Sequence, residues 1–208
     1  MEIALTVIVL IVSIIAHEVA HGYAANALGD PTARLAGRLT MNPLSHIDPL
    51  GSVIIPSLLV FTGSPMLFGW AKPVPYNPYN LKNQRWGEAI VAVAGSATNL
   101  LLALFFGLIV RFGVDVFAPA TLSFAATIAF VNLFLGLFNL IPFPPLDGFT
   151  VVRGILPYKL AGDFQRFETQ MRSMGIMSLV LFLIVFSYVL AGPFSSLVSM
   201  LFRTLIGG

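Results

Sequence analysis

The chain begins with an apolar run from Ile3 to Leu28 that is long enough to cross a lipid bilayer as one helix. A helix rises about 1.5 Å per residue, so about 20 apolar residues span a hydrocarbon core of about 30 Å. The run lacks the basic start and the short apolar centre of a signal peptide, so we keep it in the mature fold. Gly29, Asp30 and Pro31 follow the run and predict where this helix stops.

The composition of the whole chain also indicates a membrane protein. Of its 208 residues, 57% are hydrophobic and 10% are charged, whereas soluble domains carry about 25% charged residues. Such a chain lacks the polar surface of a soluble globule and is too hydrophobic for disorder. Its 11 Lys and Arg residues form no cluster, so we expect no nucleic-acid partner. With no cysteine, disulfides and cysteine-based metal sites are excluded.

Further apolar segments predict an all-α membrane protein, a bundle of about five transmembrane helices. These segments are Glu88–Val110, Thr121–Ile141, Met174–Leu190 and Phe194–Ile206. We expect one integral-membrane domain over residues 1–208, with a core at about 3–150 and C-terminal helices at about 174–206. Leu50–Phe61 contains a proline and is short for a span, which favours a re-entrant or partly buried segment.

The basic residues predict the orientation of the chain. If Leu50–Phe61 does not cross the membrane, most basic residues fall on one side and Arg111 falls on the other. The residues of the first group are Arg34, Arg38, Lys72, Lys82, Arg85, Arg153, Lys159, Arg166 and Arg172. Because short loops rich in Lys and Arg stay in the cytoplasm, we expect the N-terminus to lie outside.

The first apolar run carries the motif His17-Glu18-Val19-Ala20-His21. Two histidines four residues apart share one face of a helix and can chelate one metal ion. The glutamate beside the first histidine can act as a general base toward a water molecule. Ionisable groups at membrane depth are costly and therefore indicate function. A cluster of hydrogen bonds between helices is the alternative explanation.

A zinc site of this type takes a third protein ligand and leaves one position open. Asp147 lies in the proline-rich stretch Asn139–Gly148, where the prolines unwind the helix and let a short carboxylate turn inward. Glu88 lies at the start of a span, and His46 and Asp48 are expected near the membrane surface. An ordinary helix stop at a Pro/Gly turn is the alternative explanation for Asp147.

Taken together, these motifs resemble the site-2 protease family of intramembrane zinc metalloproteases, in its compact prokaryotic branch. The family pattern is HExxH in one core helix, and N-x-x-P followed by D-G in another, as at Asn139–Pro142 and Asp147-Gly148. Other similar stretches are Gly29–Thr32, Asn42–Gly51, Gly69–Pro75 and Ala94–Asn99. The chain departs from the family at Ser96, where proline is common. We expect no PDZ or CBS domain.

The resemblance implies a three-helix catalytic core with one zinc ion per chain, held by His17, His21 and Asp147. It makes Glu18 the general base.

The same resemblance gives two asparagines, Asn139 and Asn99, a role in holding substrate or stabilising the oxyanion. A hydrogen bond between helices would explain either amide as well. A membrane-associated β-hairpin from about Ala33 to Pro75 would offer a strand edge to an unwound substrate.

These expectations describe a zinc-dependent intramembrane endopeptidase that cuts transmembrane segments of membrane proteins in regulated intramembrane proteolysis. It would lie in a prokaryotic cytoplasmic membrane, with the lipid bilayer as its surroundings and an active site reached from the cytoplasm. A homo-oligomer is left open. The first alternative is a transporter or metal-ion permease that uses the His/Glu/Asp cluster as an ion path. The second is a different membrane zinc peptidase that takes its third ligand from a downstream glutamate.

Overall fold

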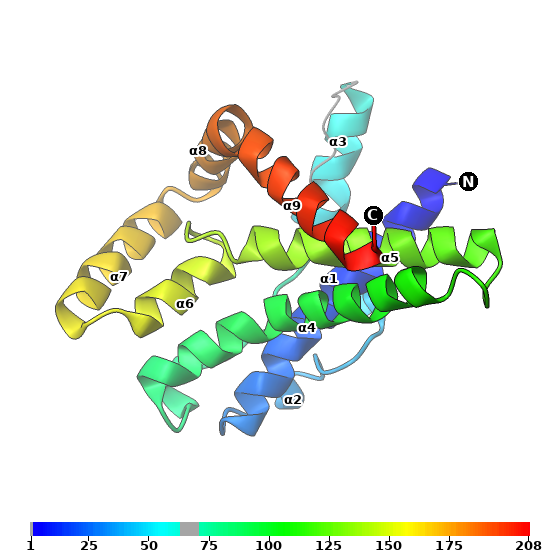
Figure 1. Ribbon diagram of the computed structural model, residues 1–208. Helices are drawn as coiled ribbons and strands as arrows, with labels where there is room; N and C mark the ends of the chain where they lie inside the picture. The colour runs from blue at the N-terminus through cyan, green and yellow to red at the C-terminus, as the bar shows by residue number, and fades with distance from the viewer. Residues whose placement is uncertain (1, 63–70) are drawn as a thin grey trace.

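The computed structural model describes residues 2–62 and 71–208, and every regular element within them is helical. Three long helices form the core, namely α1 (Glu2–Ala27), α4 (Gln84–Phe112) and α5 (Pro119–Asn139). Helix α4 packs against both α1 and α5. In Figure 1, α4 and α5 run antiparallel to each other and are joined by a short turn, while α1 crosses them. The expected all-helical class is confirmed for the described residues.

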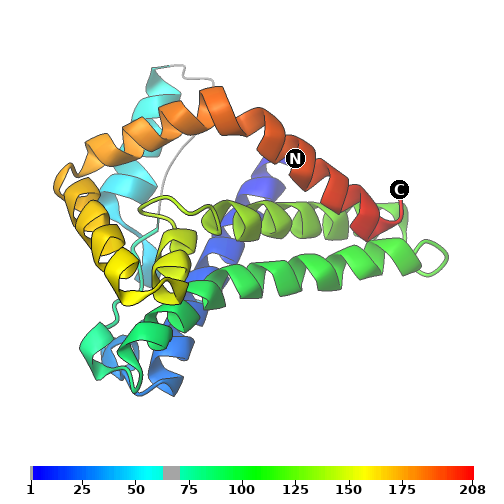
Figure 2. The same cartoon turned by 60° about the vertical axis from the view of Figure 1, so that its left-hand side comes forward.

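The C-terminal part of the chain wraps back onto this core. Helix α6 (Asp147–Ile155) packs against α4, and α7 (Tyr158–Ser173) follows it. Helix α8 (Ile176–Val185), a π-helical turn at Phe186–Leu190 and α9 (Ala191–Ile206) come next. Figure 2 shows these last three elements as one curved helical path, whose end lies over α4 and α5.

Four helices in the described residues are long and apolar enough to cross a membrane, rather than the five that the sequence predicts. They cover Ala4–Ala27, Trp86–Phe112, Pro119–Asn139 and Val180–Ile206. The two expected C-terminal spans are therefore one. Pro193 does not divide them, because it lies in the first turn of α9, just after the π-helical turn. A missing N–H is tolerated at such a place.

Short elements occupy the region between α1 and α4. They are α2 (Thr32–Leu35), a 3₁₀ turn at Pro43–His46, a π-helical turn at Pro49–Ile54, α3 (Ile55–Phe61) and a 3₁₀ turn at Pro78–Asn80. The expected β-hairpin is not confirmed, since the described part of residues 33–75 contains no strand. Prolines recur through this region and remove N–H donors that a strand ladder needs. Residues 63–70, including Trp70, lie outside the described residues.

The segment expected to be re-entrant or partly buried forms a helical arm with an exposed apolar surface. Val53, Ile54 and Leu58 are each more than half exposed, and Phe61 is 89% exposed. In Figure 1, α3 stands away from α4. Apolar side chains exposed over such an area indicate contact with lipid or protein rather than with water.

The core is built from small residues that let the long helices approach closely. Ala103 and Ala129 are buried between α4 and α5, and a Cβ added at Gly136 would lie 2.8 Å from Leu100 Cγ. Close packing of this kind drives helix association in membranes. It also brings the polar residues on the inner faces of the helices within hydrogen-bonding distance of one another.

The two ends of the bundle differ in their basic residues. Arg111 at the end of α4 donates a hydrogen bond to the carbonyl of Thr204 in α9, so these two helix ends meet. In Figure 2 the C-terminus lies near the turn between α4 and α5. Figures 1 and 2 show α2 and α7, the helices that contain Arg34 and Lys159, away from the turn between α4 and α5.

Candidate metal centre

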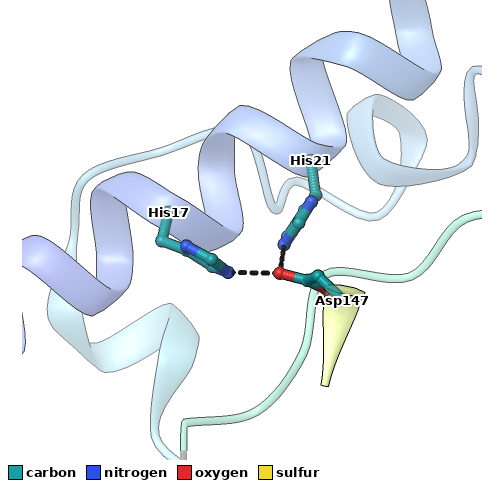
Figure 3. A group of neighbouring side chains, drawn as sticks. All are labelled: His17, His21 and Asp147. Carbon is teal, nitrogen blue, oxygen red and sulfur yellow. Dashed lines mark ion pairs between the residues drawn. The ribbon is translucent and has the colours of Figure 1, made fainter. Parts of the chain in front are cut away.

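Two histidines of α1 and one aspartate of α6 meet inside the bundle. Asp147 Oδ2 lies 2.9 Å from His17 Nε2 and 3.3 Å from His21 Nε2. The three ligand atoms all lie within 4.8 Å of one another, and Figure 3 shows both rings pointing at the same carboxylate. The side chains are 8%, 12% and 21% exposed for His17, His21 and Asp147. The structure thus brings together the three residues that the sequence singles out as metal ligands.

The proline-rich turn after α5 places the Asp147 carboxylate beside the two histidines. Helix α5 ends at Asn139, and α6 begins with Asp147 as its first residue. A Cβ on Gly148 would overlap the carbonyl of Leu140, so only glycine fits beside the turn. The helix dipole favours a negative charge in this first turn. The tight turn therefore explains the glycine of the Asp-Gly pair, and the start of α6 explains the aspartate.

Helix α4 lies close against both imidazoles at Gly95. A Cβ on Gly95 would lie 2.6 Å from His21 Nε2 and 2.7 Å from His17 Cε1. The two rings are 4.6 Å apart and perpendicular to each other. The bare backbone at Gly95 leaves room for this arrangement.

The tautomer of His21 follows from its partner. Its Nδ1 lies 2.7 Å from the backbone carbonyl of Val91. A carbonyl only accepts hydrogen bonds, so Nδ1 carries the proton in the neutral ring. The lone pair is then on Nε2, the nitrogen that faces Asp147.

His17 has the same arrangement through a side chain. Its Nδ1 lies 2.6 Å from Asn99 Oδ1, and the Asn99 amide nitrogen donates to the carbonyl of Ser13 at 3.3 Å. Because that carbonyl only accepts, the Asn99 amide nitrogen faces Ser13 and its oxygen faces His17. His17 Nδ1 is therefore the donor, and its Nε2 also presents a lone pair to Asp147.

In these protonation states the three atoms that face one another, Nε2 of each histidine and Oδ2 of Asp147, are all hydrogen-bond acceptors. Asp147 Oδ2 is buried and, with both rings neutral, it accepts no hydrogen bond within the described residues while two imidazole lone pairs point at it. Such a group is costly without a cation among the three atoms. Two histidines and one carboxylate are a three-ligand set typical of catalytic zinc, which keeps a fourth position open. The residues therefore fit a zinc ion.

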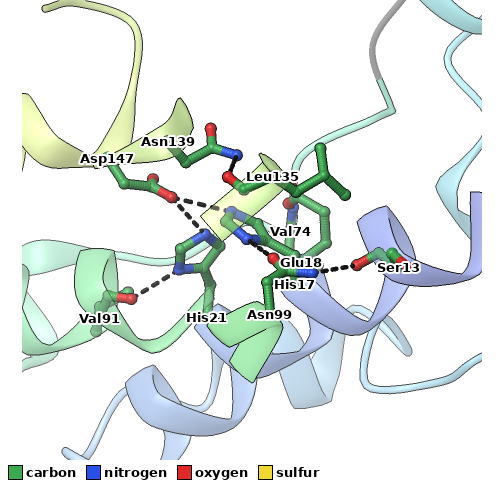
Figure 4. Close-up of polar contacts among 10 residues, drawn as sticks. All are labelled: Ser13, His17, Glu18, His21, Val74, Val91, Asn99, Leu135, Asn139 and Asp147. Atoms are coloured by element: carbon green, nitrogen blue, oxygen red, sulfur yellow. Dashed lines mark hydrogen bonds and ion pairs between the residues drawn. The ribbon is translucent and has the colours of Figure 1, made fainter. Parts of the chain in front are cut away.

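Glu18 is tied to the extended chain that precedes α4. Its Oε2 accepts a hydrogen bond of 2.8 Å from the backbone N–H of Val74. The Arg38 guanidinium donates to the carbonyl of Lys72 at 2.8 Å and holds the same segment. Figure 4 places the Glu18 carboxylate beside His17. The carboxylate has a fixed position next to the metal ligands.

Asp30 anchors the same segment further along. This buried carboxylate accepts hydrogen bonds from the backbone N–H of Asn77, the amide of Asn80 and both donors of Thr32. Burial alone would raise the pKa of the Asp30 carboxyl, but these donors lower it below its ordinary value. The chain from 71 to 80 is therefore attached at both ends to α1 and the turn after it.

The other acidic and imidazole candidates are engaged elsewhere. Glu88 pairs with Arg153 of α6, which also pairs with Glu168 at 2.6 Å. His46 is buried, and its Nε2 lies 2.8 Å from the carbonyl of Thr40. The predicted alternatives for a third ligand thus have partners outside the metal centre.

The two predicted asparagines differ. Asn139 lies at the end of α5, on the same side of the rings as Asp147, and its amide donates to the carbonyl of Leu135 in its own helix at 3.0 Å (Figure 4). Asn99 is fully buried and bonded to His17, as described above. Both amide hydrogens of Asn99 have acceptors, Ser13 O and Asn132 Oδ1. The hydrogen bond between helices therefore describes Asn99 better than contact with substrate.

The model of peptidase family M50 matches residues 5–117 and 114–186 of this chain. The chain belongs to peptidase family M50. This is the site-2 protease family, and the resemblance drawn from the motifs is confirmed. M50 peptidases are membrane proteins, in agreement with the four apolar helices.

Several relatives of this M50 chain have names that describe zinc metalloproteases. YwhC of Bacillus subtilis is 40% identical over 196 residues, which cover 88% of this chain and 83% of YwhC. Rip2 of Mycolicibacterium smegmatis is 32% identical over 84% of this chain and 64% of its own length. Rip3 of Mycobacterium tuberculosis is 34% identical over 76% of this chain and 32% of its own length. No solved structure matches this chain.

Membership of M50 decides between the functional classes. The chain is a metalloprotease of the site-2 type, and zinc is the metal that its relatives imply. The transporter or permease is not favoured.

Two residues near this M50 centre, Asn132 and Ser13, are not predicted from the sequence. Both are buried, and both bond to Asn99 or to each other. A polar amide within an apolar span was the available signal for Asn132. Its link to His17 needs the packing of three helices and has no sequence spacing of its own.

Proposed function

We propose that this M50 peptidase is a zinc-dependent intramembrane endopeptidase of the HExxH type. It would hydrolyse peptide bonds within or near transmembrane segments of membrane-protein substrates, in regulated intramembrane proteolysis. The observation that carries the proposal is the convergence of His17, His21 and Asp147. The two histidines and Glu18 belong to a helix long and apolar enough to span a membrane, and Asp147 reaches them from α6. One domain over residues 1–208 would hold the whole site.

His17, His21 and Asp147 would hold one zinc ion per chain. Each histidine has its Nδ1 proton bound to an acceptor, which leaves its Nε2 free to coordinate. When bound, zinc would supply a Lewis acid that polarises the scissile carbonyl and lowers the pKa of water toward about 7.

Glu18 would act as the general base. Its carboxylate would take a proton from the attacking water as the oxygen bonds to the carbonyl carbon, and would pass that proton to the amide nitrogen as the C–N bond breaks. The remaining proton of the new carboxyl group also passes to the amine. The products are one carboxylate and one ammonium group, so atoms and charges balance. The hydrogen bond from Val74 N–H holds the carboxylate in place.

Asn139 is the polar group proposed to hold substrate or stabilise the oxyanion. Its amide donates within its own helix and lies on the same side of the rings as Asp147 (Figure 4). A turn of its side chain would aim an N–H at the carbonyl oxygen of a bound peptide. We do not assign this role to Asn99, whose amide hydrogens are both used in the core.

Water would reach the site from the cytoplasmic side of a prokaryotic cytoplasmic membrane. A cavity of about 490 Å³ lies between the 76–79 loop and α4, α6 and α7, and charged side chains line it. Thr150, one turn of α6 after Asp147, borders this cavity. The basic loops at this end of the bundle support the orientation.

The substrate would be a transmembrane helix that unwinds in the bilayer, because a helical peptide bond is shielded by its own hydrogen bonds. The extended chain that contacts Glu18 through Val74 would present the edge predicted for strand addition. A homo-oligomer would fit the large apolar surfaces. A nucleic-acid partner stays unexpected.

The test is the Glu18→Gln variant. We expect purified, zinc-loaded wild-type protein to cut a model transmembrane substrate in lipid vesicles, and Glu18→Gln to lose at least about 100-fold in rate, as is typical for a lost general base. Zinc content should stay at one per chain in both proteins. Mass spectrometry of the products reports the cleaved bond, and equal rates for the two proteins would overturn the proposal.

A further inference from the structure

A chain of buried polar side chains runs through the core behind the metal centre. Asn132 of α5 is 1% exposed, Asn99 of α4 is fully buried, and Ser13 of α1 is 3% exposed. Each of the three core helices contributes one member. Buried polar groups in an apolar bundle are retained where their hydrogen bonds do something that packing cannot.

The hydrogen bonds of Asn132 fix its own orientation. Its amide nitrogen donates to the carbonyl of Ile128 at 2.9 Å and to the hydroxyl of Ser13 at 2.9 Å. The Ile128 carbonyl only accepts, so the NH₂ group must lie on that side. Asn132 Oδ1 therefore faces the other way, toward α4.

The orientation of Asn132 in turn fixes the orientation of the Asn99 amide. Asn132 Oδ1 accepts a hydrogen bond of 2.8 Å from the Asn99 amide nitrogen. A flipped Asn99 would place two oxygens against each other here, and its oxygen would also meet the carbonyl of Ser13. The Asn99 oxygen is thus held toward His17 Nδ1, at 2.6 Å.

The flip would matter for metal binding. With its NH₂ group toward His17, Asn99 would donate to Nδ1 and move the ring proton to Nε2. The protonated Nε2 could not coordinate, because a metal takes neutral imidazole through a lone pair. One amide orientation in α4 therefore decides whether His17 is a ligand.

We propose that Asn132, assisted by Ser13, is a positioning residue that fixes the Asn99 amide and thereby holds His17 in the tautomer that binds zinc. The proposal rests on the zinc site of the proposed function. Its test measures metal affinity and not proteolysis, so the two can fail separately.

The first measurement is the zinc affinity of the full-length chain in detergent, by competition with a chromophoric chelator. Asn132→Leu keeps the shape of the side chain and removes its hydrogen bonds. We expect it to raise the zinc Kd about tenfold, the lower range for loss of a group that orients a ligand. Thr127→Val is the matched control, because Thr127 is half-buried on the same helix and its hydroxyl donates to the Ser123 carbonyl within that helix. It should leave the Kd unchanged.

A double-mutant cycle separates positioning from packing. In an Asn99→Asp background either carboxylate oxygen accepts the His17 Nδ1 proton, so no orientation remains to be fixed. Asn132→Leu should then leave the zinc Kd unchanged. A purely structural role would weaken binding by the same factor in both backgrounds.

The inference is overturned by a wild type that binds no zinc, by an unchanged Kd in Asn132→Leu, or by equal losses in both backgrounds. If Asn132→Leu does not fold, Ser13→Ala enters the same cycle. It removes one acceptor of the Asn132 amide and should raise the Kd in the wild-type background alone. No change there, or the same change in both backgrounds, overturns the inference. A wild type that binds zinc but cuts no substrate contradicts the proposed function. The double-mutant cycle still tests the role of Asn132 in that case, because it measures zinc affinity.

Discussion

A single carboxylate oxygen organises the metal centre. Asp147 Oδ2 faces both imidazoles, whereas the competing acid Glu88 is paired with Arg153. We expect Asp147→Ala to lose tight zinc binding, because two histidines alone leave the ion with too few protein ligands. Metal analysis of protein dialysed against a weak chelator should show well under one zinc per chain.

The matched variant for this measurement is Glu88→Gln. It changes an acid that lies in the same bundle and contacts Arg153 but not the histidines. Zinc content should stay at one per chain. If Glu88→Gln loses zinc while Asp147→Ala keeps it, the third ligand is the downstream glutamate and our ligand set is wrong.

Gly95 is the residue against which both imidazoles rest. Gly95→Ala would place a methyl group 2.6 Å from His21 Nε2, closer than carbon and nitrogen can approach. The rings must then move, and we expect the zinc Kd to rise at least about tenfold. Chelator competition measures this loss, and an unchanged Kd would show that the rings do not rest on this backbone.

Gly107→Ala serves as its control on the same helix. There the added methyl group would press on the side chain of Leu205 in α9, far along α4 from the histidines. It should lower the melting temperature without changing the zinc Kd.

At this scale the sequence predicts the ligands because their geometry is local. His17 and His21 share a helix face by spacing alone, and Asp147 stands out as an acid in an apolar stretch. The polar chain through Asn99 and Asn132 could not be predicted in the same way. Its members come from separate helices, and only the packing of those helices joins them.

At the scale of elements, the segment from 71 to 80 owes its course over α1 to Asp30. We expect Asp30→Ala to destabilise the fold by about 2 kcal/mol, because the donors of Thr32, Asn77 and Asn80 lose a buried acceptor. Thermal unfolding in detergent measures the change. Asp163→Ala is the control, since Asp163 is 70% exposed and only loosely paired with Arg166.

The same contact predicts a pH dependence. The pKa of Asp30 is lowered in the folded protein, so its contribution is present above the ordinary aspartate pKa of about 3.9 and is lost as the pH falls through the folded value. The gap in melting temperature between wild type and Asp30→Ala should therefore narrow at acidic pH. A gap that widens on acidification would contradict the assignment.

The elements themselves follow the sequence where hydropathy is long and uninterrupted. Helices α1, α4 and α5 lie close to the predicted spans. The prediction fails at Gly192-Pro193, which looks like a break between spans. The π-helical turn at Phe186–Leu190 absorbs the irregularity, and the helix continues. Such a turn depends on local hydrogen bonding and has no hydropathy signal.

At the scale of the whole molecule, the number of spans sets the topology. The four candidate spans of the described residues would return the C-terminus to the side of the N-terminus, and the contact between Arg111 and Thr204 agrees with this. The predicted orientation puts the turn between α4 and α5 outside and the region of α7 in the cytoplasm.

Because the chain has no cysteine, single cysteines can report this topology. Val114 in the turn after α4 is 67% exposed, and Lys159 in α7 is also exposed. We expect a membrane-impermeant maleimide to label Val114→Cys in intact cells and to label Lys159→Cys only after permeabilisation. The reverse pattern would place the site on the outer side.

The central claim is that one zinc ion binds where α1 meets α6. Anomalous X-ray scattering measured on both sides of the zinc absorption edge locates that ion directly in a crystal of the full chain. The account predicts one anomalous peak per chain, bonded to Nε2 of His17, Nε2 of His21 and the carboxylate of Asp147. A peak coordinated by Glu18 or Glu88 in place of Asp147, or no zinc peak in a zinc-loaded, active protein, would contradict it.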